Sequence, residues 1–322
     1  MSAGGEVVIA VDVGGTTIAA GLVTPAGEVL EERRVPAEPA ARATLATIEA
    51  MIDDLRRRAG DRRVRGIGVG VPGPVDAGHV AADIPHAPDL AERPLADLLR
   101  ARFALPAHVD NDVNALALGE WRFGVGRGAR SLVVLAAGTG FGCGIVLDGR
   151  LVRGVNGFGG EFGHTPVKFD GPRCWCGGRG CLAIYASGRG IAEAARARVA
   201  GDARAPLLTA AGHVGAITAP LVFRLAAAGD PVAAAVVDEA CRALGAMIAT
   251  IVNGLNPEAV VITGGVAESL LALEKPIRAA AGEYAFPRAL AATRLSIVPA
   301  DKRTTMRGAA ALVLYEEAQA RD

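Results

Sequence analysis

Residues 7–23 read VVIAVDVGGTTIAAGLV, and the fold is predicted from this segment outward. An apolar run, Val7–Val13, leads into a glycine and threonine turn, and a second apolar run, Thr17–Val23, follows. Continuous β-branched runs between turn residues are typical of buried strands, so we predict two strands joined by a glycine turn. Pro25-Ala26-Gly27 marks the next turn, and we expect a third strand over Glu28–Val35.

The same pattern returns at residues 131–147, which read SLVVLAAGTGFGCGIVL. An apolar run again meets a glycine and threonine turn, Gly138-Thr139-Gly140, before a second apolar run. The order of strand, glycine turn and strand is the same in both stretches, which indicates two related halves. The sequence therefore predicts an α/β fold with duplicated halves.

The rest of the chain supplies helices and further strands. Helical spacing of apolar residues and cap signals predict helices over Ala41–Arg58, Pro94–Phe103, Asp112–Phe123, Asp230–Asn253 and Thr305–Ala318. Short apolar runs predict strands over Val64–Val71, His108–Val109, Ala259–Thr263 and Arg294–Val298. We expect Gly254 and Pro257 to end the long helix.

The composition excludes several classes of protein. A chain of 322 residues exceeds the ~250–300 residues at which one core stops growing, so we expect two lobes. A hydrophobic fraction of 51% excludes intrinsic disorder. The 34 basic residues balance 34 acidic residues, so we expect neither a nucleic-acid partner nor a membrane partner. Residues 1–23 contain Glu6 and Asp12 and no basic start, which argues against a signal peptide and favours a cytoplasmic protein.

Three of the five cysteines lie close together, at Cys174, Cys176 and Cys181. With His164 they form a complete tetrahedral ligand set for zinc, and a set without an open position indicates a structural ion. The alternative is a group of reduced, buried thiols. Cys143 and Cys241 lie in apolar contexts, and we expect both to be core thiols.

Asp110-Asn111-Asp112 follows a short strand and begins a helix. Such residues cap the first turn of a helix, and we expect one of the three to do so. A carboxylate here is also suited to act as a general base toward a hydroxyl group, and Asn is suited to orient a sugar. The two interpretations are compatible.

The glycine motifs are candidate nucleotide sites. Asp12-Val13-Gly14-Gly15-Thr16-Thr17 offers backbone N–H groups to phosphates and a carboxylate to hydrated Mg²⁺, although a plain hairpin would use the same residues. The second copy at Gly138–Gly142 favours a phosphate clamp. Thr263-Gly264-Gly265 fits either a nucleoside contact or an ordinary turn between a strand and a helix.

Together these motifs resemble the ROK family (repressor, open reading frame, kinase), which has the two-lobed actin-like, ribonuclease H-like ATPase fold. The matching segments cover nearly the whole chain: Asp12–Thr16, Gly70–Val75, Asn111–Ala115, Gly138–Gly144, Glu161–His164, Cys174–Cys181 and Gly264-Gly265. Glu161-x-Gly163-His164 followed by Cys-x-Cys-Gly-x-x-Gly-Cys is the most specific part. Residues 110–124, DNDVNALALGEWRFG, are most similar to the glucokinase members.

The resemblance implies a role for each matching residue. Asp112 would be the general base toward the sugar 6-hydroxyl. The sugar would contact Gly73, Asn111, Asp112, Glu161 and His164. The phosphates of Mg-ATP would lie among Asp12, Gly14, Gly15, Thr16, Thr139 and Gly140, and adenosine against Gly264 and Gly265. His164, Cys174, Cys176 and Cys181 would bind structural Zn²⁺, which would stiffen the loop that carries Glu161.

The resemblance also implies a division into lobes. Residues 1–115 with residues 303–322 would form the small N-terminal lobe, and residues 116–302 the larger C-terminal lobe with the zinc-binding loop. Repressor members carry an additional N-terminal helix-turn-helix, and Asp12 lies too near the start for one, so we expect no DNA binding.

Three positions depart from the family pattern. Thr17 stands where Lys is frequent, Asp89 stands where Asn is common, and Ala183 stands where Glu is usual. Two of these changes lie on the sugar side, so they affect the choice of sugar more than the reaction.

The sequence thus predicts an ATP- and Mg²⁺-dependent hexokinase acting on the 6-hydroxyl of glucose or a closely related hexose. One alternative is a kinase of a modified hexose, such as 3-amino-3-deoxyglucose or an N-acetylhexosamine. Another is a non-catalytic sugar sensor, against which the intact Asp112 argues. Because family members are often dimers or tetramers, we expect a homo-oligomer.

Overall fold

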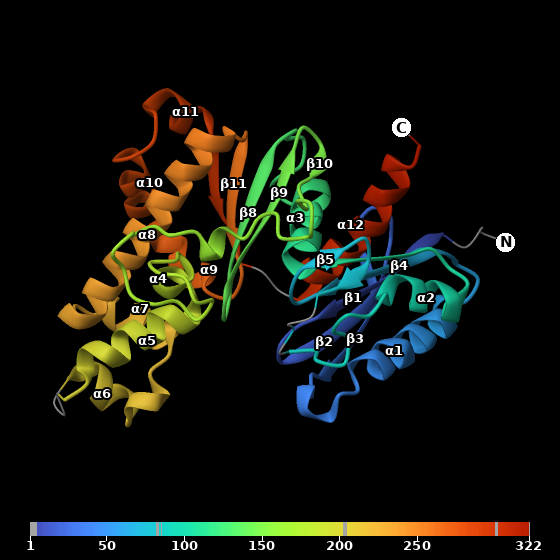
Figure 1. Cartoon of the computed structure of the whole chain (residues 1–322), viewed down its shortest axis with the longest axis horizontal. Helices are drawn as coiled ribbons and strands as arrows, with labels where there is room; N and C mark the ends of the chain where they lie inside the picture. Colours follow the sequence, from blue (N-terminus) through green and yellow to red (C-terminus); the bar gives the residue numbers. More distant parts are fainter. Residues whose placement is uncertain (1–4, 82–83, 85, 202–204, 300–301, 322) are drawn as a thin grey trace. The chain divides into compact units, whose positions relative to one another are not determined.

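The computed structural model describes residues 5–81, 84, 86–201, 205–299 and 302–321 (Figure 1). The first four residues of the N-terminal stretch therefore lie outside the described part. No single described helix is long and apolar enough to cross a membrane. Among the described helices, only α7 (Ala219–Ala227) and α8 (Pro231–Leu255) together reach that length and apolarity, and they are bent by 111°.

Two five-stranded sheets have the same strand order. The first has the order β3-β2-β1-β4-β7 and the second has the order β10-β9-β8-β11-β12. The first sheet contains β1 (Glu6–Val13), β2 (Thr17–Val23), β3 (Val29–Pro36), β4 (Arg63–Val71) and β7 (Ala107–Asn111). The second contains β8 (Leu132–Ala137), β9 (Phe141–Leu147), β10 (Arg150–Leu151), β11 (Ala259–Thr263) and β12 (Arg294–Ile297). A small hairpin consists of β5 (Val75–Asp76) and β6 (His79–Val80).

The strand directions repeat as well as the strand order. β1 runs antiparallel to β2 and parallel to β4, and β4 runs parallel to β7. In the second sheet, β8, β11 and β12 run parallel to one another and β10 runs antiparallel to β9. This repetition confirms the two related α/β halves predicted from residues 7–23 and 131–147.

The chain forms two compact units. The first comprises Met1–Arg130, Gly144–Gly160 and Asp301–Asp322, and the second comprises Ser131–Cys143 and Glu161–Ala300. The helices of the first unit are η1 (Pro39–Ala41), α1 (Thr44–Ala59), α2 (Leu95–Phe103), α3 (Asp112–Phe123) and α12 (Lys302–Gln319). Those of the second are η2 (Phe162–His164), α4 (Ala183–Ala186), α5 (Gly188–Val199), α6 (Pro206–Ala211), η3 (Val214–Ala216), α7 (Ala219–Ala227), α8 (Pro231–Leu255), α9 (Ala267–Leu270), η4 (Leu271–Leu273), α10 (Glu274–Gly282) and α11 (Pro287–Ala292).

Helices cover both faces of the first sheet, and β1 shows why its sequence is apolar throughout. Ile9 and Val11 belong to a core shared with α1 and α2. The alternate residues Val8 and Ala10 belong to a second core, with Ala309 of α12. Successive side chains of a strand point to opposite faces, so a strand covered on both sides has no polar alternation. In Figure 1, α1 and α2 lie on one side of this sheet and α12 on the other.

The long helix α8 begins as predicted but ends later. Asp230 is its N-cap, with the side-chain Oδ1 accepting a hydrogen bond from the N–H of Ala233 at 2.7 Å. The helix continues through Gly254 to Leu255, and Asn256 takes the left-handed cap conformation at φ 45°. Asn tolerates this conformation because its short amide can bond locally, so Gly254 is not needed as the stop.

Candidate functional site

The first group of predicted site residues lies at the turn from β7 into α3. Asn111 is the N-cap of α3, and its Oδ1 accepts hydrogen bonds from the N–H groups of Val113 and Asn114 at 2.9 and 3.1 Å. Its Nδ2 donates to the carbonyl oxygen of Gly73 at 3.1 Å. Asn111 therefore performs the capping that the sequence assigned to one of the three residues, and its NH₂ group carries a second donor hydrogen.

The carboxylate of Asp110 is buried within this turn, with its side chain only 2% exposed. Its Oδ1 accepts hydrogen bonds from the N–H of Asn111 and from Nδ2 of Asn114, at 2.7 and 2.9 Å. Its Oδ2 accepts from Nε of Arg153 at 2.6 Å, and Arg153 also pairs with Glu316 at 2.5 Å. Burial disfavours the charged guanidinium, but Asp110 and Glu316 hold the pKa of Arg153 above its usual range. Sequence reasoning missed Arg153, whose partners are 43 and 163 residues away.

Asp112 is the first residue of α3, and its Oδ1 accepts a hydrogen bond from the N–H of Val113 at 2.9 Å. The N-terminus of a helix carries a partial positive charge, which stabilises a carboxylate there. Gly70 of β4 lies beneath this turn, because a side-chain carbon on Gly70 would lie 3.3 Å from Cα of Asp112. The Asp112 carboxylate is therefore held at a fixed place at the start of α3.

The register of the first sheet brings Asp12 to the same edge. Gly70 pairs with Asp12 of β1 on one side and with Asp110 of β7 on the other. These three strands are parallel, and in open α/β sheets the carboxyl ends of parallel strands form the ligand-binding edge. Asp12 is buried, and its Oδ2 accepts a hydrogen bond from the hydroxyl group of Thr305 at 2.8 Å.

Gly73 lies just beyond the end of β4 and must be glycine. Its φ of +105° is unfavourable for other residues, and a side-chain carbon there would meet the side chain of Ile84. The same residue accepts the hydrogen bond from Asn111. The predicted sugar contacts Gly73 and Asn111 are thus joined directly.

The two glycine loops have similar construction. The N–H of Gly14 donates to the carbonyl oxygen of Thr17 at 3.0 Å, and the N–H of Gly138 donates to that of Gly140 at 3.0 Å. The next two residues are exposed in both loops, namely Gly15 and Thr16 in the first and Thr139 and Gly140 in the second. Each loop therefore places two exposed residues at its tip, where a phosphate could approach the backbone.

His86 lies against the first loop and was not singled out by the sequence. A side-chain carbon on Gly15 would lie 3.2 Å from Nδ1 of His86. Gly15 therefore leaves room for the imidazole ring beside this loop.

Gly264 brings the end of β11 close to β8. Its φ is +99°, and a side-chain carbon there would lie 2.5 Å from the carbonyl oxygen of Ala137. The N–H of Val266 donates to the same carbonyl at 2.9 Å. The Gly264-Gly265 turn is thus anchored directly beside the second glycine loop.

A cavity of about 440 Å³ lies beside the second loop, and its walls include Gly138, Thr139, Arg189, Arg196, Gly265 and Ser269. Ligand sites are typically about 300–1,000 Å³, so the cavity has a suitable size. The structure thus brings together Thr139 and Gly265, which the sequence placed at phosphate and adenosine respectively. The cavity wall also includes Arg189 and Arg196 of α5, which belong to none of the motifs found in the sequence.

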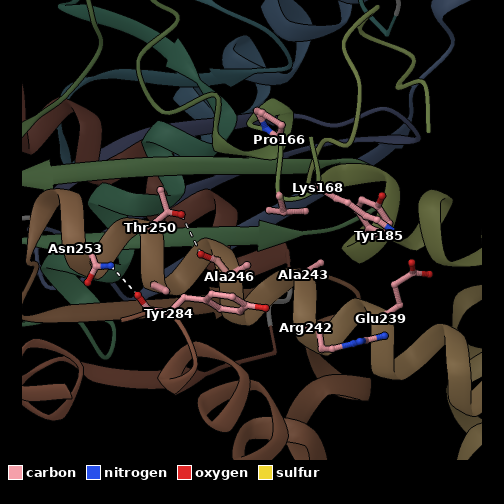
Figure 2. Close-up of a pocket in the computed structure, with 12 residues that line it drawn as sticks. Pro166, Lys168, Tyr185, Glu239, Arg242, Ala243, Ala246, Thr250, Asn253 and Tyr284 are labelled. Atoms are coloured by element: carbon pink, nitrogen blue, oxygen red, sulfur yellow. Dashed lines mark hydrogen bonds between the residues drawn. The ribbon is translucent and has the colours of Figure 1, made fainter. Parts of the chain in front are cut away.

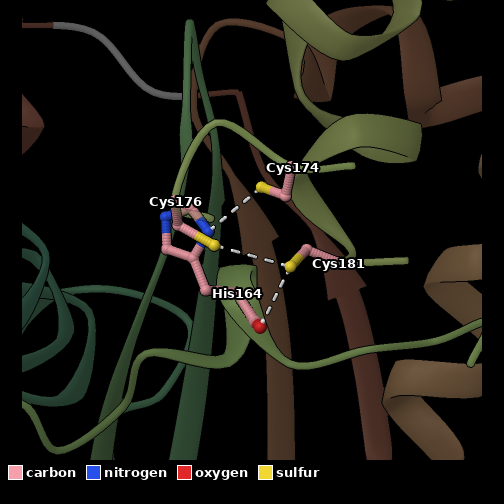
Figure 3. Close-up of side chains that lie close together, drawn as sticks. All are labelled: His164, Cys174, Cys176 and Cys181. Carbon is pink, nitrogen blue, oxygen red and sulfur yellow. Dashed lines mark hydrogen bonds between the residues drawn. The ribbon is translucent and has the colours of Figure 1, made fainter. Parts of the chain in front are cut away.

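The predicted metal ligands form one compact cluster (Figure 3). Nδ1 of His164 lies 3.6 Å from Sγ of Cys174, and Sγ of Cys176 lies 3.7 Å from Sγ of Cys181. All four ligand atoms lie within 4.8 Å of one another. Ligands of a tetrahedral zinc ion at ~2.0–2.3 Å are separated by about 3.3–3.8 Å. The four residues therefore fit a tetrahedral metal ion.

The remaining cysteines are core thiols, as predicted. Cys143 and Cys241 are buried, and burial raises the pKa of Cys241 to about 11. Burial likewise raises the pKa of Cys143, with a smaller effect from the Glu161 carboxylate. Both thiols stay protonated near neutral pH.

Glu161 lies at the start of η2, the short turn that ends in His164. Its side chain is exposed, and its carbonyl oxygen accepts a hydrogen bond from the N–H of His164 at 3.0 Å. Gly163 between them is packed so closely on the carbonyl group of Phe141 that no side chain fits. Glu161 is therefore carried by the same short turn as His164, a member of the cluster.

A second cavity, of about 450 Å³, lies along α8 (Figure 2). Two of its polar side chains bond to backbone carbonyl groups: Asn253 Nδ2 to Tyr284 and Thr250 Oγ1 to Ala246, each at 3.0 Å. The described residues that the sequence assigned to catalysis, substrate, nucleotide or metal do not line this cavity.

A model of the ROK family matches residues 8–316. The chain belongs to the ROK family.

Individual ROK proteins agree with this assignment. The glucokinase of Halalkalibacterium halodurans is 39% identical over 289 residues, which cover 87% of this chain and 86% of that protein. The N-acetylmannosamine kinase of Citrobacter koseri is 34% identical over 271 residues, or 82% of this chain and 86% of that protein. The crystal structure of a ROK family glucokinase from Streptomyces griseus, in complex with glucose and AMPPNP, has a TM-score of 0.77 and 34% identity, covering 94% of this chain and 98% of that chain.

Membership of the ROK family confirms the resemblance and the actin-like fold predicted from the motifs. The glucokinase and N-acetylmannosamine kinase relatives identify the chain as a sugar kinase.

Proposed function

We propose that this ROK protein transfers the γ-phosphoryl group of ATP to the 6-hydroxyl group of glucose or of a closely related hexose. The register of the first sheet carries the proposal, because it places Asp12 of the first glycine loop on the same sheet edge as the turn that holds Asp112. Likeness to a glucokinase solved with glucose and AMPPNP supports both substrates.

Asp112 is the proposed general base. Its carboxylate takes the proton of the sugar 6-hydroxyl while the hydroxyl oxygen attacks the γ-phosphorus atom. The bond from that phosphorus atom to the bridging oxygen then breaks, and ADP leaves. Phosphoryl transfer depends mainly on positioning and on stabilisation of charge, and the helix N-terminus at Asp112 and the Asn111 cap provide the positioning. Gly73, Asn111, Glu161 and His164 are the proposed sugar contacts.

The glycine loops are the proposed nucleotide site. Backbone N–H groups at Gly15, Thr16, Thr139 and Gly140 would bind phosphate oxygens, and Gly264 and Gly265 would contact adenosine. Gly14 would belong to the same site as the residue whose N–H closes the first loop onto Thr17. The carboxylate of Asp12 is an oxygen ligand of the kind that Mg²⁺ prefers. When bound, Mg²⁺ neutralises charge on the phosphates.

The proposed metal of the cysteine cluster is zinc. His164, Cys174, Cys176 and Cys181 would hold it, and a full set of four protein ligands leaves no position for substrate, so its effect is structural. Because Glu161 is on the turn that ends in His164, a rigid cluster would hold Glu161 in place.

The second candidate function is a kinase of a modified hexose. The observation that favours it is Ala183, which is fully buried at the start of α4 and offers no carboxylate to a sugar. An N-acetylmannosamine kinase among the relatives agrees with this candidate. Asp89, the other departure on the sugar side, accepts the N–H of Leu45 through Oδ2 at 3.0 Å and so supports the first turn of α1.

A coupled assay of ADP release tests the function and separates the two candidates. Purified protein with ATP and Mg²⁺ is offered glucose, mannose, glucosamine, N-acetylmannosamine and 3-amino-3-deoxyglucose. The highest kcat/KM with glucose is expected. A higher value with an N-acetylated or amino sugar would favour the second candidate, and no turnover with any hexose would contradict both.

We make four further predictions about the whole protein. We propose that it is cytoplasmic and that it needs no nucleic-acid partner. We also propose that it forms a homo-oligomer, either a dimer or a tetramer. We also propose that its lobes divide the chain near residues 115 and 303. Light scattering coupled to gel filtration would measure the assembly, and a mass equal to one chain would contradict it.

A further inference from the structure

Arg189 is fixed at the second glycine loop by its backbone. Its N–H donates to the carbonyl oxygen of Thr139 at 3.2 Å, and the N–H of Gly188 donates to that of Gly138 at 2.8 Å. The first turn of α5 is therefore attached to the loop proposed for phosphate. The Arg189 side chain forms part of the cavity wall beside that loop.

The guanidinium group of Arg189 lies over the ring of Trp175, with Cζ 4.5 Å from the ring centroid. Trp175 is the residue between two cysteines of the metal cluster, and its ring meets the ring of His164 edge-on at 6.4 Å and 89°. Tryptophan is the strongest aromatic partner for a cation. A continuous series of contacts thus runs from the cluster through Trp175 to the cavity, all within the second unit.

Within the protein, the charge of Arg189 makes only a weak ion pair. Its Nε donates to the carboxylate of Glu193 at 2.7 Å, with side chains 51% and 45% exposed. An exposed pair four residues apart on a helix contributes little to stability. A nucleotide phosphate carries more negative charge than one carboxylate and accepts two guanidinium hydrogen bonds at once, so it competes well for this group.

We propose that Arg189 binds a phosphate of the nucleotide and that Trp175 is a positioning residue, which holds the guanidinium at the cavity wall. This inference rests on the proposed use of ATP in the same cavity. Held between the Trp175 face and α5, the long arginine side chain has fewer conformations to lose when the nucleotide binds. The metal loop thereby contributes to nucleotide affinity as well as to the position of Glu161.

The test compares four variants of the full-length, metal-loaded protein. Arg189→Met should raise KM for ATP about tenfold or more, because a hydrogen-bonded charge is lost. Trp175→Leu should raise it about threefold, and Trp175→Phe should restore most of the affinity because a cation-binding face remains. The double variant should match Arg189→Met alone, because Trp175 acts only through Arg189. In all four, KM for the sugar should stay unchanged and kcat should change less than KM for ATP.

Arg198→Met is the matched control. Arg198 is on the same helix but pairs with Glu239 and is not part of the cavity wall. Its replacement removes the same charge and should leave KM for ATP unchanged. Zinc content and thermal unfolding of every variant show whether the cluster and the fold are intact.

Two results would overturn the inference. An unchanged KM for ATP in Arg189→Met would exclude phosphate binding by this residue. Effects of Arg189→Met and Trp175→Leu that multiply in the double variant would exclude the positioning role.

Calorimetric titration with AMPPNP in the absence of sugar separates this inference from the proposed function. Wild-type protein that binds AMPPNP but phosphorylates no hexose would contradict the proposed function, while the Kd ratios of the variants would still decide the inference. Wild-type protein that binds no AMPPNP would overturn both.

Discussion

Asp110, Asn111 and Asp112 are neighbours in the sequence, but the structure uses each in a different way. Asp110 is buried against Arg153, Asn111 caps α3, and Asp112 begins the helix at the carboxyl edge of the first sheet. A buried carboxylate with a committed arginine partner is structural, because removing either charge would leave the other unpaired. Of the two acids, Asp112 is therefore the one suited to take a proton from substrate.

Asp112→Asn tests this assignment. The amide keeps the shape and can still accept the N–H of Val113, but it is not a base. We expect kcat to fall by at least about 10²-fold with little change in melting temperature. Asp97→Asn, which removes an exposed carboxylate on α2, is the control and should retain wild-type kcat. Substantial turnover by Asp112→Asn would show that another group is the base.

At the scale of elements, the loop with the cysteine cluster has little regular structure of its own. Its only described backbone pairings of strand type are two isolated bridges, Pro166 with Cys181 and Arg173 with Arg179. A metal ion bound by four residues would cross-link such a loop, and metal binding of this kind is coupled to folding.

Cys176→Ser should therefore lose zinc and stability together. We expect much less than one zinc per chain by plasma mass spectrometry, and a lower melting temperature. Cys241→Ser, in α8 and outside the cluster, is the control and should keep its zinc. Stoichiometric zinc in Cys176→Ser, with unchanged unfolding, would contradict the assignment of the cluster.

The packing of α3 against α12 is a second feature at this scale. A side-chain carbon on Gly119 of α3 would lie 2.8 Å from Cα of Gly308 in α12, and one on Gly308 would lie 2.7 Å from the carbonyl oxygen of Ala115. The two helices thus approach closely because both lack side chains at the crossing. This contact joins the C-terminal helix to the helix that carries Asp112.

Gly308→Ala should lower the free energy of unfolding by about 1–3 kcal/mol, because the methyl group overpacks the helix crossing. Gly254→Ala is the control, since a side-chain carbon there meets nothing within 4 Å in the described part of the chain. It should be neutral or stabilise α8 by up to ~1 kcal/mol, because Ala favours a helix more than Gly does. Urea unfolding measures both changes. Equal effects would show that the crossing tolerates a methyl group.

At the scale of the whole molecule, stability should depend on pH through His108 of β7. Burial lowers the pKa of His108 in the folded protein below its usual value of about 6.5. Between the two pKa values the unfolded chain binds more protons, so stability is complete above pH ~6.5 and falls as the pH decreases through the lower, folded pKa. His108→Gln should weaken this dependence below pH ~6.5, as measured by urea unfolding. Equal slopes for wild type and variant would contradict it.

Local sequence patterns were enough to predict most of the helices and strands and the motifs they carry. The helix Asp112–Phe123 and the strand Ala259–Thr263 were predicted with the bounds that the structure gives. The spacing of apolar residues reflects which side of an element is buried, and turn residues reflect local backbone conformation. Both patterns lie within short segments, so a single sequence is enough to predict the elements. The glycine loops and the cysteine cluster were found for the same reason, since spacing alone marks them.

Which distant residues are partners could be known only from the folded chain. Nothing in the local sequence around Arg153 or Arg189 shows what either side chain contacts. In the structure, Arg153 pairs with Asp110 and Glu316. The guanidinium group of Arg189 lies over the ring of Trp175. Nor does the sequence show that Gly308 lies at a helix crossing rather than in open solvent. Such roles depend on which surfaces come into contact when the strands pair and the helices pack. These contacts result from close packing of the whole core, so residues near in the sequence do not determine them.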